Sequence, residues 1–102
     1  MTTEFCQITT TMSGRRDADT LARAVLDTGL AERVQLDTGV TSYVMTSDGV
    51  AVNPDELRLT VRARTEFAAD VVRLLRSGHD YEPEDVVVDV VAILDGDELR
   101  IE

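Results

Sequence analysis

The sequence has 102 residues, the length of a single domain (residues 1–102) built around one hydrophobic core. Its 20 acidic residues outnumber its 10 basic residues, all of them arginine, and the net charge of -10 repels phosphate backbones and anionic lipids. We therefore expect no nucleic-acid partner and no membrane partner, and a hydrophobic content of 43% argues against a disordered chain.

The expected cellular compartment is inferred from three sequence features that are absent. No apolar run approaches the roughly 18 residues of a membrane span, and the first residues have neither the basic start nor the apolar block of a signal peptide. The single cysteine, Cys6, cannot form an intrachain disulfide, and no Cys/His cluster has zinc spacing. We expect a cytoplasmic protein in a reducing environment.

The first half of the chain predicts a strand, a helix and a bent extended segment. Residues 4–11 alternate as a strand that places Cys6 and Phe5 on opposite faces. Apolar residues recur at helical spacing from Arg15 to Gly29, where glycine is suited to end the helix. Residues 34–45 are extended and bend near residues 37–39.

The second half predicts two more strands and a helix. Turn signals lie at residues 47–49 and 53–55, and residues 57–64 then alternate strictly between aliphatic and mainly arginine side chains. Thr65 is predicted to cap a helix that ends at Gly78. After a polar loop, the apolar run 86–94 fits a central strand buried on both faces, and residues 99–102 fit a small edge strand.

The order strand, helix, two strands, helix, strand predicts an α+β fold, the ferredoxin-like βαββαβ arrangement. In this fold an antiparallel sheet carries both helices on one face. The other face stays bare, and if it is apolar it must be covered, most simply by other subunits.

Five segments resemble the CutA divalent-cation tolerance family, in the family's order. They are residues 21–26 (LARAVL), 29–34 (GLAERV), 39–43 (GVTSY), 59–65 (LTVRART) and 79–84 (HDYEPE). The resemblance is to a divergent, C-terminally shortened member. The cysteine that the family often has at the end of its first strand falls on Thr10, and the lysine of its "L-x-x-K-T" strand end is Arg64.

The resemblance implies a tight homotrimer of ferredoxin-like subunits that is linked to tolerance of copper and other divalent ions. It implies a non-enzymatic binding or scaffold protein with weak divalent-cation binding and no other cofactor. It also assigns His79 and Glu84 to the proposed metal region.

The loop after the second helix carries the residues most suited to chemistry. His79, Tyr81, Glu82 and Glu84 combine one imidazole with carboxylates, which could bind a divalent ion or act in acid-base catalysis. The alternative is a solvated loop in which His79 makes a capping contact. One histidine is too few for a preformed metal site unless three subunits pool their ligands.

Arg58, Arg62 and Arg64 form a basic stripe on one strand face, where i, i+2 neighbours such as Arg62 and Arg64 lie about 7 Å apart by strand geometry. Arg62 and Arg64, with Tyr81 of the loop, could hold a carboxylate or phosphate. The favoured alternative is salt bridging to the abundant acids. Cys6 is interpreted as a small buried hydrophobe rather than a nucleophile.

Two other functions remain open. A recruited small-molecule enzyme or pathway-specific binder would use an intersubunit cleft near Tyr43, with His79 or Glu82 as base and Arg64 as anion clamp. A PII-like nucleotide-sensing trimer would share the architecture, but the sequence has no Gly-rich phosphate loop after the first strand.

Overall fold

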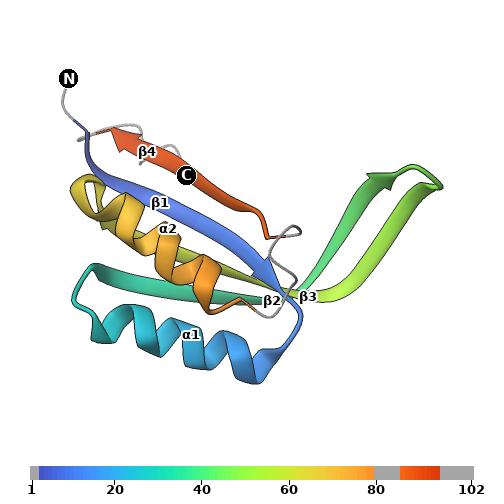
Figure 1. Cartoon of the computed structure of the whole chain (residues 1–102), viewed down its shortest axis with the longest axis horizontal. Helices are drawn as coiled ribbons and strands as arrows, with labels where there is room; N and C mark the ends of the chain where they lie inside the picture. Colours follow the sequence, from blue (N-terminus) through green and yellow to red (C-terminus); the bar gives the residue numbers. More distant parts are fainter. Residues whose placement is uncertain (1–2, 80–85, 95–102) are drawn as a thin grey trace.

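The computed structural model describes residues 3–79 and 86–94, and its elements follow the predicted order (Figure 1). They are β1 (Thr3–Met12), α1 (Arg15–Asp27), β2 (Ala31–Thr46), β3 (Gly49–Arg64), the 3-10 helix η1 (Thr65–Phe67), α2 (Ala68–Ser77) and β4 (Val88–Leu94). The strands form one antiparallel sheet in the order β2-β3-β1-β4. The α+β ferredoxin-like prediction is confirmed.

Both helices cover the same face of the sheet, as predicted (Figure 1). The central strands β1 and β3 supply alternate residues to the core, for example Ile8 opposite Val61. Leu21 and Val25 of α1 and Leu75 of α2 pack against them. This face is closed by aliphatic packing, which leaves the residues of opposite parity on the other face, here called the open face.

The open face is polar for most of its area. Along β1 the alternation turns Phe5 and Gln7 toward it, and along β3 it turns Arg58, Arg62 and Arg64 toward it. A second subunit is therefore not needed to cover an apolar sheet face. Apart from Val91 of β4, which pairs with Gln7, the large exposed apolar residues of the described chain lie elsewhere.

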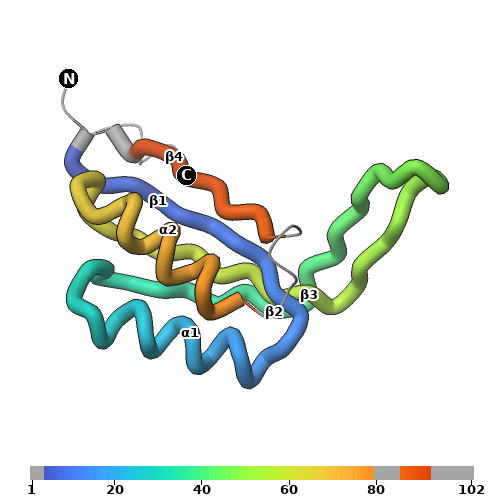
Figure 2. Tube along the Cα trace, viewed as in Figure 1, coloured from blue at the N-terminus to red at the C-terminus, as the bar shows by residue number. Residues whose placement is uncertain are grey.

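A hairpin arm projects beyond the body of the sheet (Figures 1 and 2). We define it as residues 42–53, the paired ends of β2 and β3 on either side of a turn at residues 47–48, within the turn predicted at 47–49. The ladder slips twice between Asp37 and Ser42, at the predicted bend. Gly39 and Asp55 take left-handed backbone angles there, with φ of 71° and 61°.

A buried carboxylate fastens the base of the arm. Glu56 is buried, and its Oε1 accepts a 2.5 Å hydrogen bond from the Ser42 hydroxyl on the facing strand. A charge-assisted bond of this kind is stronger than a neutral one. It ties β2 to β3 where the register shifts have interrupted the regular ladder.

Two local predictions were wrong. The turn expected at residues 53–55 is instead a kink within β3, because the strand continues paired with β2 through it. Pro54 donates no ladder hydrogen bond, so its place beside a register shift is the one a strand tolerates. Thr65 does not cap a helix: it begins η1, and neither η1 nor α2 has a side-chain cap hydrogen bond.

The prediction of a central strand at residues 86–94 was also wrong. β4 lies at the edge of the sheet, because β1 takes the central position between β3 and β4. Val90 and Val91 are 48% and 61% exposed. Its apolar sequence therefore indicates more burial than one chain provides. The edge strand expected at residues 99–102 lies outside the described residues.

Gly29 follows the last turn of α1 with φ of 78°, as the sequence predicts for a residue that ends a helix. We expect Gly29→Ala to lower the free energy of unfolding by about 1 kcal/mol, because a side chain disfavours left-handed angles. No atom within 4 Å would meet the added Cβ, so the cost is conformational rather than steric.

Urea denaturation of the parent, Gly29→Ala and Gly29→Asn measures this cost. Asparagine tolerates the left-handed region, so that variant should lose less stability than the alanine variant. Equal stability of Gly29→Ala and the parent would contradict the assigned conformation.

Candidate functional site

Each arginine of the predicted basic stripe is paired with an acid of the same chain. Arg62 Nε donates to Glu32 Oε1 at 2.7 Å, while Arg58 Nη2 lies 3.5 Å from Asp37 Oδ2. Arg64 Nε lies 3.8 Å from Glu66 Oε2, too far for a hydrogen bond. Salt bridging, the favoured interpretation of the stripe, thus describes Arg58 and Arg62 better than Arg64.

Two of these arginines also contact an aromatic ring. Phe5 lies opposite Arg64 in the β1–β3 ladder, and the Cζ atoms of Arg62 and Arg64 lie 4.6 Å and 5.6 Å from its ring centroid. Guanidinium groups at these distances are attracted to the ring face. The ring is thereby half-buried on the open face without contact with the helices' core.

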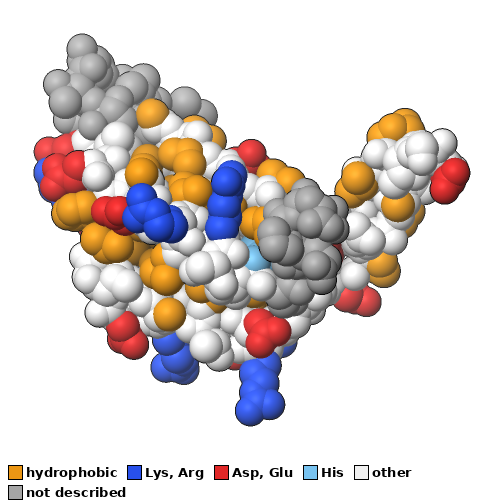
Figure 3. Space-filling view, viewed as in Figure 1, with side chains coloured by type: hydrophobic (Ala, Val, Ile, Leu, Met, Phe, Trp, Pro, Cys, Tyr) orange, Lys and Arg blue, Asp and Glu red, His pale blue; other side chains and the backbone are white. Residues whose placement is uncertain are grey.

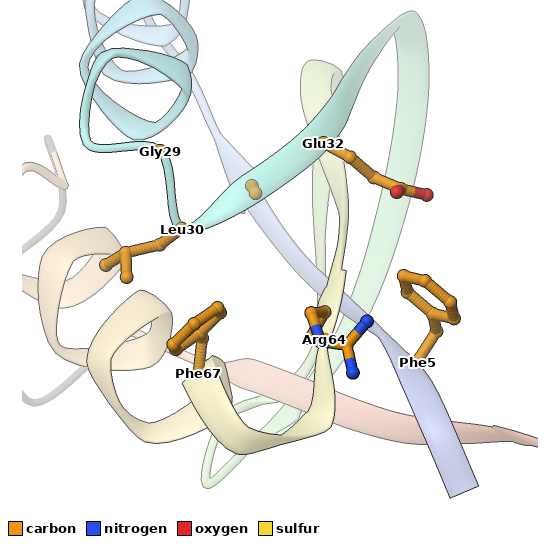
Figure 4. A pocket seen from close by; sticks show the side chains of 7 residues that line it. Phe5, Gly29, Leu30, Glu32, Arg64 and Phe67 are labelled. Carbon is orange, nitrogen blue, oxygen red and sulfur yellow. The ribbon is translucent and has the colours of Figure 1, made fainter.

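A pocket of about 160 Å³ opens at this end of the sheet (Figure 4). Its wall comes from the start of β1, from the connection between α1 and β2, and from the end of β3 with η1. The lining residues include Phe5, Gly29, Leu30, Glu32, Arg64 and Phe67. Arg64 extends its guanidinium toward Phe5, while Phe67 and Leu30 lie toward the helices. The pocket combines aromatic walls with one cation and one carboxylate.

His79 lies at the other end of β1, against a buried threonine. Thr10 is 2% exposed, and its hydroxyl donates to the Val87 carbonyl at 2.7 Å. The hydroxyl has only one proton, so at its 3.0 Å contact with His79 Nε2 it must accept. His79 Nε2 therefore carries a proton and cannot act as a metal ligand in this arrangement.

The described residues of one chain do not fit a metal site. In residues 3–79 and 86–94, no three His, Cys, Asp or Glu residues come together in a way that could hold an ion. Tyr81, Glu82 and Glu84 of the predicted loop lie outside the described residues. His79 is thus not part of a group of three possible ligands within that part of the chain.

A single chain also keeps the predicted catalytic and clamping residues apart. His79 contacts Thr10, whereas Arg64 faces Phe5, five residues back along β1 and roughly 17 Å away by strand geometry. Tyr43 pairs with Val52 on the arm, at the opposite end of β3 from Arg64. A site that uses all of them requires residues from more than one subunit.

Cys6 matches its interpretation as a core residue. It is 1% exposed among the aliphatic residues of the core. Burial raises the pKa of the Cys6 thiol above its usual value, because the charged thiolate loses its hydration. At neutral pH the group is a protonated thiol with little nucleophilic reactivity.

The sequence did not predict which residues line the pocket together with Arg64. Phe5, Phe67 and Glu32 line the pocket with Arg64, but they come from three separate segments. Only the register of β1 on β3 and the position of the connection after α1 bring them together. The one available signal was composition, because Phe5 and Phe67 are the only two phenylalanines in the chain.

A sequence model of one family, described as CutA1 divalent ion tolerance protein, matches residues 6–96. The chain belongs to the CutA1 family. The match includes β1 from Cys6 onward, both helices and all of β4, so it covers the whole described core. No curated protein matches the sequence.

Solved CutA structures share the fold. CutA1 from Shewanella sp. SIB1, described as a stable protein from a psychrotrophic bacterium, has a TM-score of 0.83 at 21% identity, over 99% of this chain and 92% of its own. CutA1 from Ehrlichia chaffeensis has a TM-score of 0.81 at 14% identity, with the same coverage. CutA from Archaeoglobus fulgidus, described as periplasmic, has 0.80 at 20% identity, over 94% and 90%. At these identities the likeness establishes the fold.

None of the helices in the described residues has both the length and the hydropathy that a membrane crossing requires.

The Thr10 hydroxyl joins β1 to both His79 and the segment before β4. We expect Thr10→Val, which keeps the shape of the side chain, to lower the free energy of unfolding by about 1–3 kcal/mol. The Val87 carbonyl and the His79 Nε2–H would each lose the hydrogen bond to the Thr10 hydroxyl, in a partly buried position. Urea denaturation measures the change.

The matched control is Thr9→Val, the same substitution one residue earlier and on the open face. It should change stability by no more than about 0.5 kcal/mol. Equal losses in the two variants would show that the Thr10 hydroxyl contributes nothing specific.

Proposed function

We propose that this CutA1-family chain works in the cytoplasm as a homotrimeric binding or scaffold protein. Its binding of divalent cations such as copper would be weak and would use ligands from more than one subunit. The observation that carries the proposal is the distribution of exposed apolar side chains. The family's description, divalent ion tolerance, supplies the class of ligand.

Exposed apolar residues gather in two places (Figure 3). Of the nine large hydrophobic residues exposed in the described chain, five lie on the hairpin arm and three at β4 or just before it. On the arm Tyr43 and Met45 are 72% and 76% exposed. An apolar projection of this kind is unusual on a monomer and typical of a surface buried by a partner.

The β4 edge offers a second surface of matching character. No strand of the described residues pairs with its outer side, which lies beside exposed valines, so a strand from another chain could extend the sheet there. The arm and the β4 edge are different patches of one chain. A contact between different patches is heterologous and closes into a ring when the rotation permits, and the resemblance supplies the number three.

Charge opposes this assembly. A trimer would carry a net charge of about three times -10. The described arginine stripe pairs with acids of its own chain, so little of it is left to bridge subunits. Apolar burial at the arm and the β4 edge would have to supply the association energy.

Pooling between subunits supports weak rather than tight cation binding. One described chain supplies His79 but no cluster of three ligands, and the Nε2 atom of His79 donates to Thr10. His79 and Glu84 stay the proposed metal residues, with the remaining ligands drawn from neighbouring subunits. Sites of carboxylates and a lone imidazole bind divalent ions loosely.

The arm is the first target for testing the assembly. Met45 and Val50 face each other across the arm, and we expect the double variant Met45→Glu, Val50→Glu to convert a trimer into monomers. The carboxylates would have to lose their hydration in the interface. Light scattering coupled to size-exclusion chromatography measures the mass.

Leu26→Glu is the control, because Leu26 is the one exposed large hydrophobic residue of the described chain that lies outside both surfaces. This variant should remain trimeric. A parent protein that is monomeric over the whole accessible concentration range would contradict the proposal.

Titration of the protein with copper, with the heat of binding measured by calorimetry, tests the cation site. We expect weak binding by the parent and a loss of about tenfold in affinity for His79→Ala. Thr10→Val is the control, since it removes the hydrogen-bond partner but keeps the imidazole. The monomeric arm variant should also lose binding if ligands are pooled. Unchanged weak binding in His79→Ala would remove the support for a site at this residue.

A further inference from the structure

We propose that the pocket at the end of β3 binds a small aromatic monocarboxylate, a single ring that carries one carboxylate. Arg64 would hold the carboxylate, and Phe67 and Leu30 would contact the ring. This ligand site goes beyond the cation binding and assembly proposed above. It follows from four features of the pocket.

The first feature is that Arg64 makes no short hydrogen bond to an acid of the described chain. Arg62 is engaged by a 2.7 Å hydrogen bond to Glu32, so its charge is matched. In the described part of the chain, Arg64 has only the 3.8 Å ion pair to Glu66 and the 5.6 Å approach to Phe5. Neither contact occupies its N–H groups in a short hydrogen bond. The planar guanidinium of Arg64 therefore has N–H groups suited to a carboxylate, which can accept two parallel hydrogen bonds from it.

The second feature is the aromatic wall. Both phenylalanines of the chain line this one pocket, although they are far apart in sequence. Phe67 is half-buried and Leu30 lies beside it, toward the helices (Figure 4). A flat apolar ligand gains both hydrophobic burial and ring contacts from such a wall.

The third feature is size. A cavity of about 160 Å³ is close to the volume that accommodates one benzene ring in a protein interior, roughly 150 Å³. A nucleotide or a two-ring ligand does not fit this space. Gly29 lines the wall without a side chain, and nothing lies within 4 Å of where its Cβ would be, so the entrance is open on that side.

The fourth feature is charge. The chain has a net charge of -10, and Glu32 and Glu66 lie beside the pocket, so a polyanion such as a phosphate ester is disfavoured. Glu32 is matched by Arg62. Glu66 is exposed, so its carboxylate can yield its place near Arg64 to the carboxylate of a ligand. One guanidinium then balances one negative charge.

The pocket and the arm lie at opposite ends of β3, so the two proposals can fail separately. Arg64 ends the strand, while the arm contains its first residues. The monomeric arm variant can therefore be tested for ligand binding as well as the parent.

Benzoate is the probe, followed by two-dimensional ¹H–¹⁵N NMR on the full chain. We expect concentration-dependent shifts of the Leu30, Ala31 and Glu32 amides and of the Arg64 side chain. Nine heavy atoms imply a dissociation constant in about the millimolar range. Arg64→Gln should weaken binding about fivefold or more, because it removes the charge and the donor fork.

Arg58→Gln is the matched control. Arg58 lies on the same strand and face, with a side chain 47% exposed against 48% for Arg64, and should leave the affinity within about twofold of the parent. Benzamide lacks the charge and acetate lacks the ring, so each should bind at least fivefold more weakly than benzoate. Folding of each variant is checked by the dispersion of its own spectrum.

Several results would overturn the proposal. One is the absence of benzoate shifts in the pocket residues. Another is equal loss in Arg64→Gln and Arg58→Gln, which would indicate general attraction of an anion to the stripe. Acetate binding as tightly as benzoate, or benzamide binding as tightly, would also refute it, because the pocket would then select the charge or the ring alone.

Discussion

The antiparallel pairing of β1 with β3 is the constraint on which the rest of the molecule depends. It sets Ile8 opposite Val61 in the core, and the same alternation sets Phe5 opposite Arg64 on the open face. The register of β1 on β3 thus determines both which residues form the core and which residues line the pocket. A slip of one residue would turn the arginines into the core and the aliphatic residues to solvent. Because an unpaired buried guanidinium is very costly, the register that protects the core also builds the pocket.

The acidic charge and the exposed apolar residues act in opposite directions. Five ion pairs in the described chain join arginines to nearby acids, and exposed pairs of this kind contribute little to stability. The exposed apolar residues of the arm and of β4 are not part of the described core of one chain. Under the proposed assembly they would provide the attraction that overcomes the repulsion between acidic subunits. The Ser42–Glu56 bond would then serve association as well as folding, because it helps to set where the arm departs from the sheet.

The histidine region shows how a family resemblance and local geometry can differ. The resemblance places the family's cysteine at Thr10, and in the structure the Thr10 hydroxyl accepts a hydrogen bond from His79 Nε2 while it donates one to the Val87 carbonyl. A threonine here is a structural link between β1, the end of α2 and the start of β4. Any cation chemistry at His79 must be compatible with that link, which favours a weak site over a tight one.

Much of the architecture could be predicted from the alternation of residues 57–64, the helical stripes and Gly29, because these patterns are local and each depends on neighbouring residues in the chain. The prediction was wrong at residues 86–94. The apolar run there indicated a central strand, but in the structure β4 is an edge strand. Burial depends on what lies beside a strand, and the sequence of the strand does not contain that information. For the same reason, the contacts within the candidate site could not be predicted from the sequence. The sequence by itself determined the fold class, the basic stripe and the buried Cys6. Only the tertiary structure decided that Arg62 is matched by Glu32 while Arg64 meets the distant Phe5, because those contacts depend on strand register and on the path of the connections between elements.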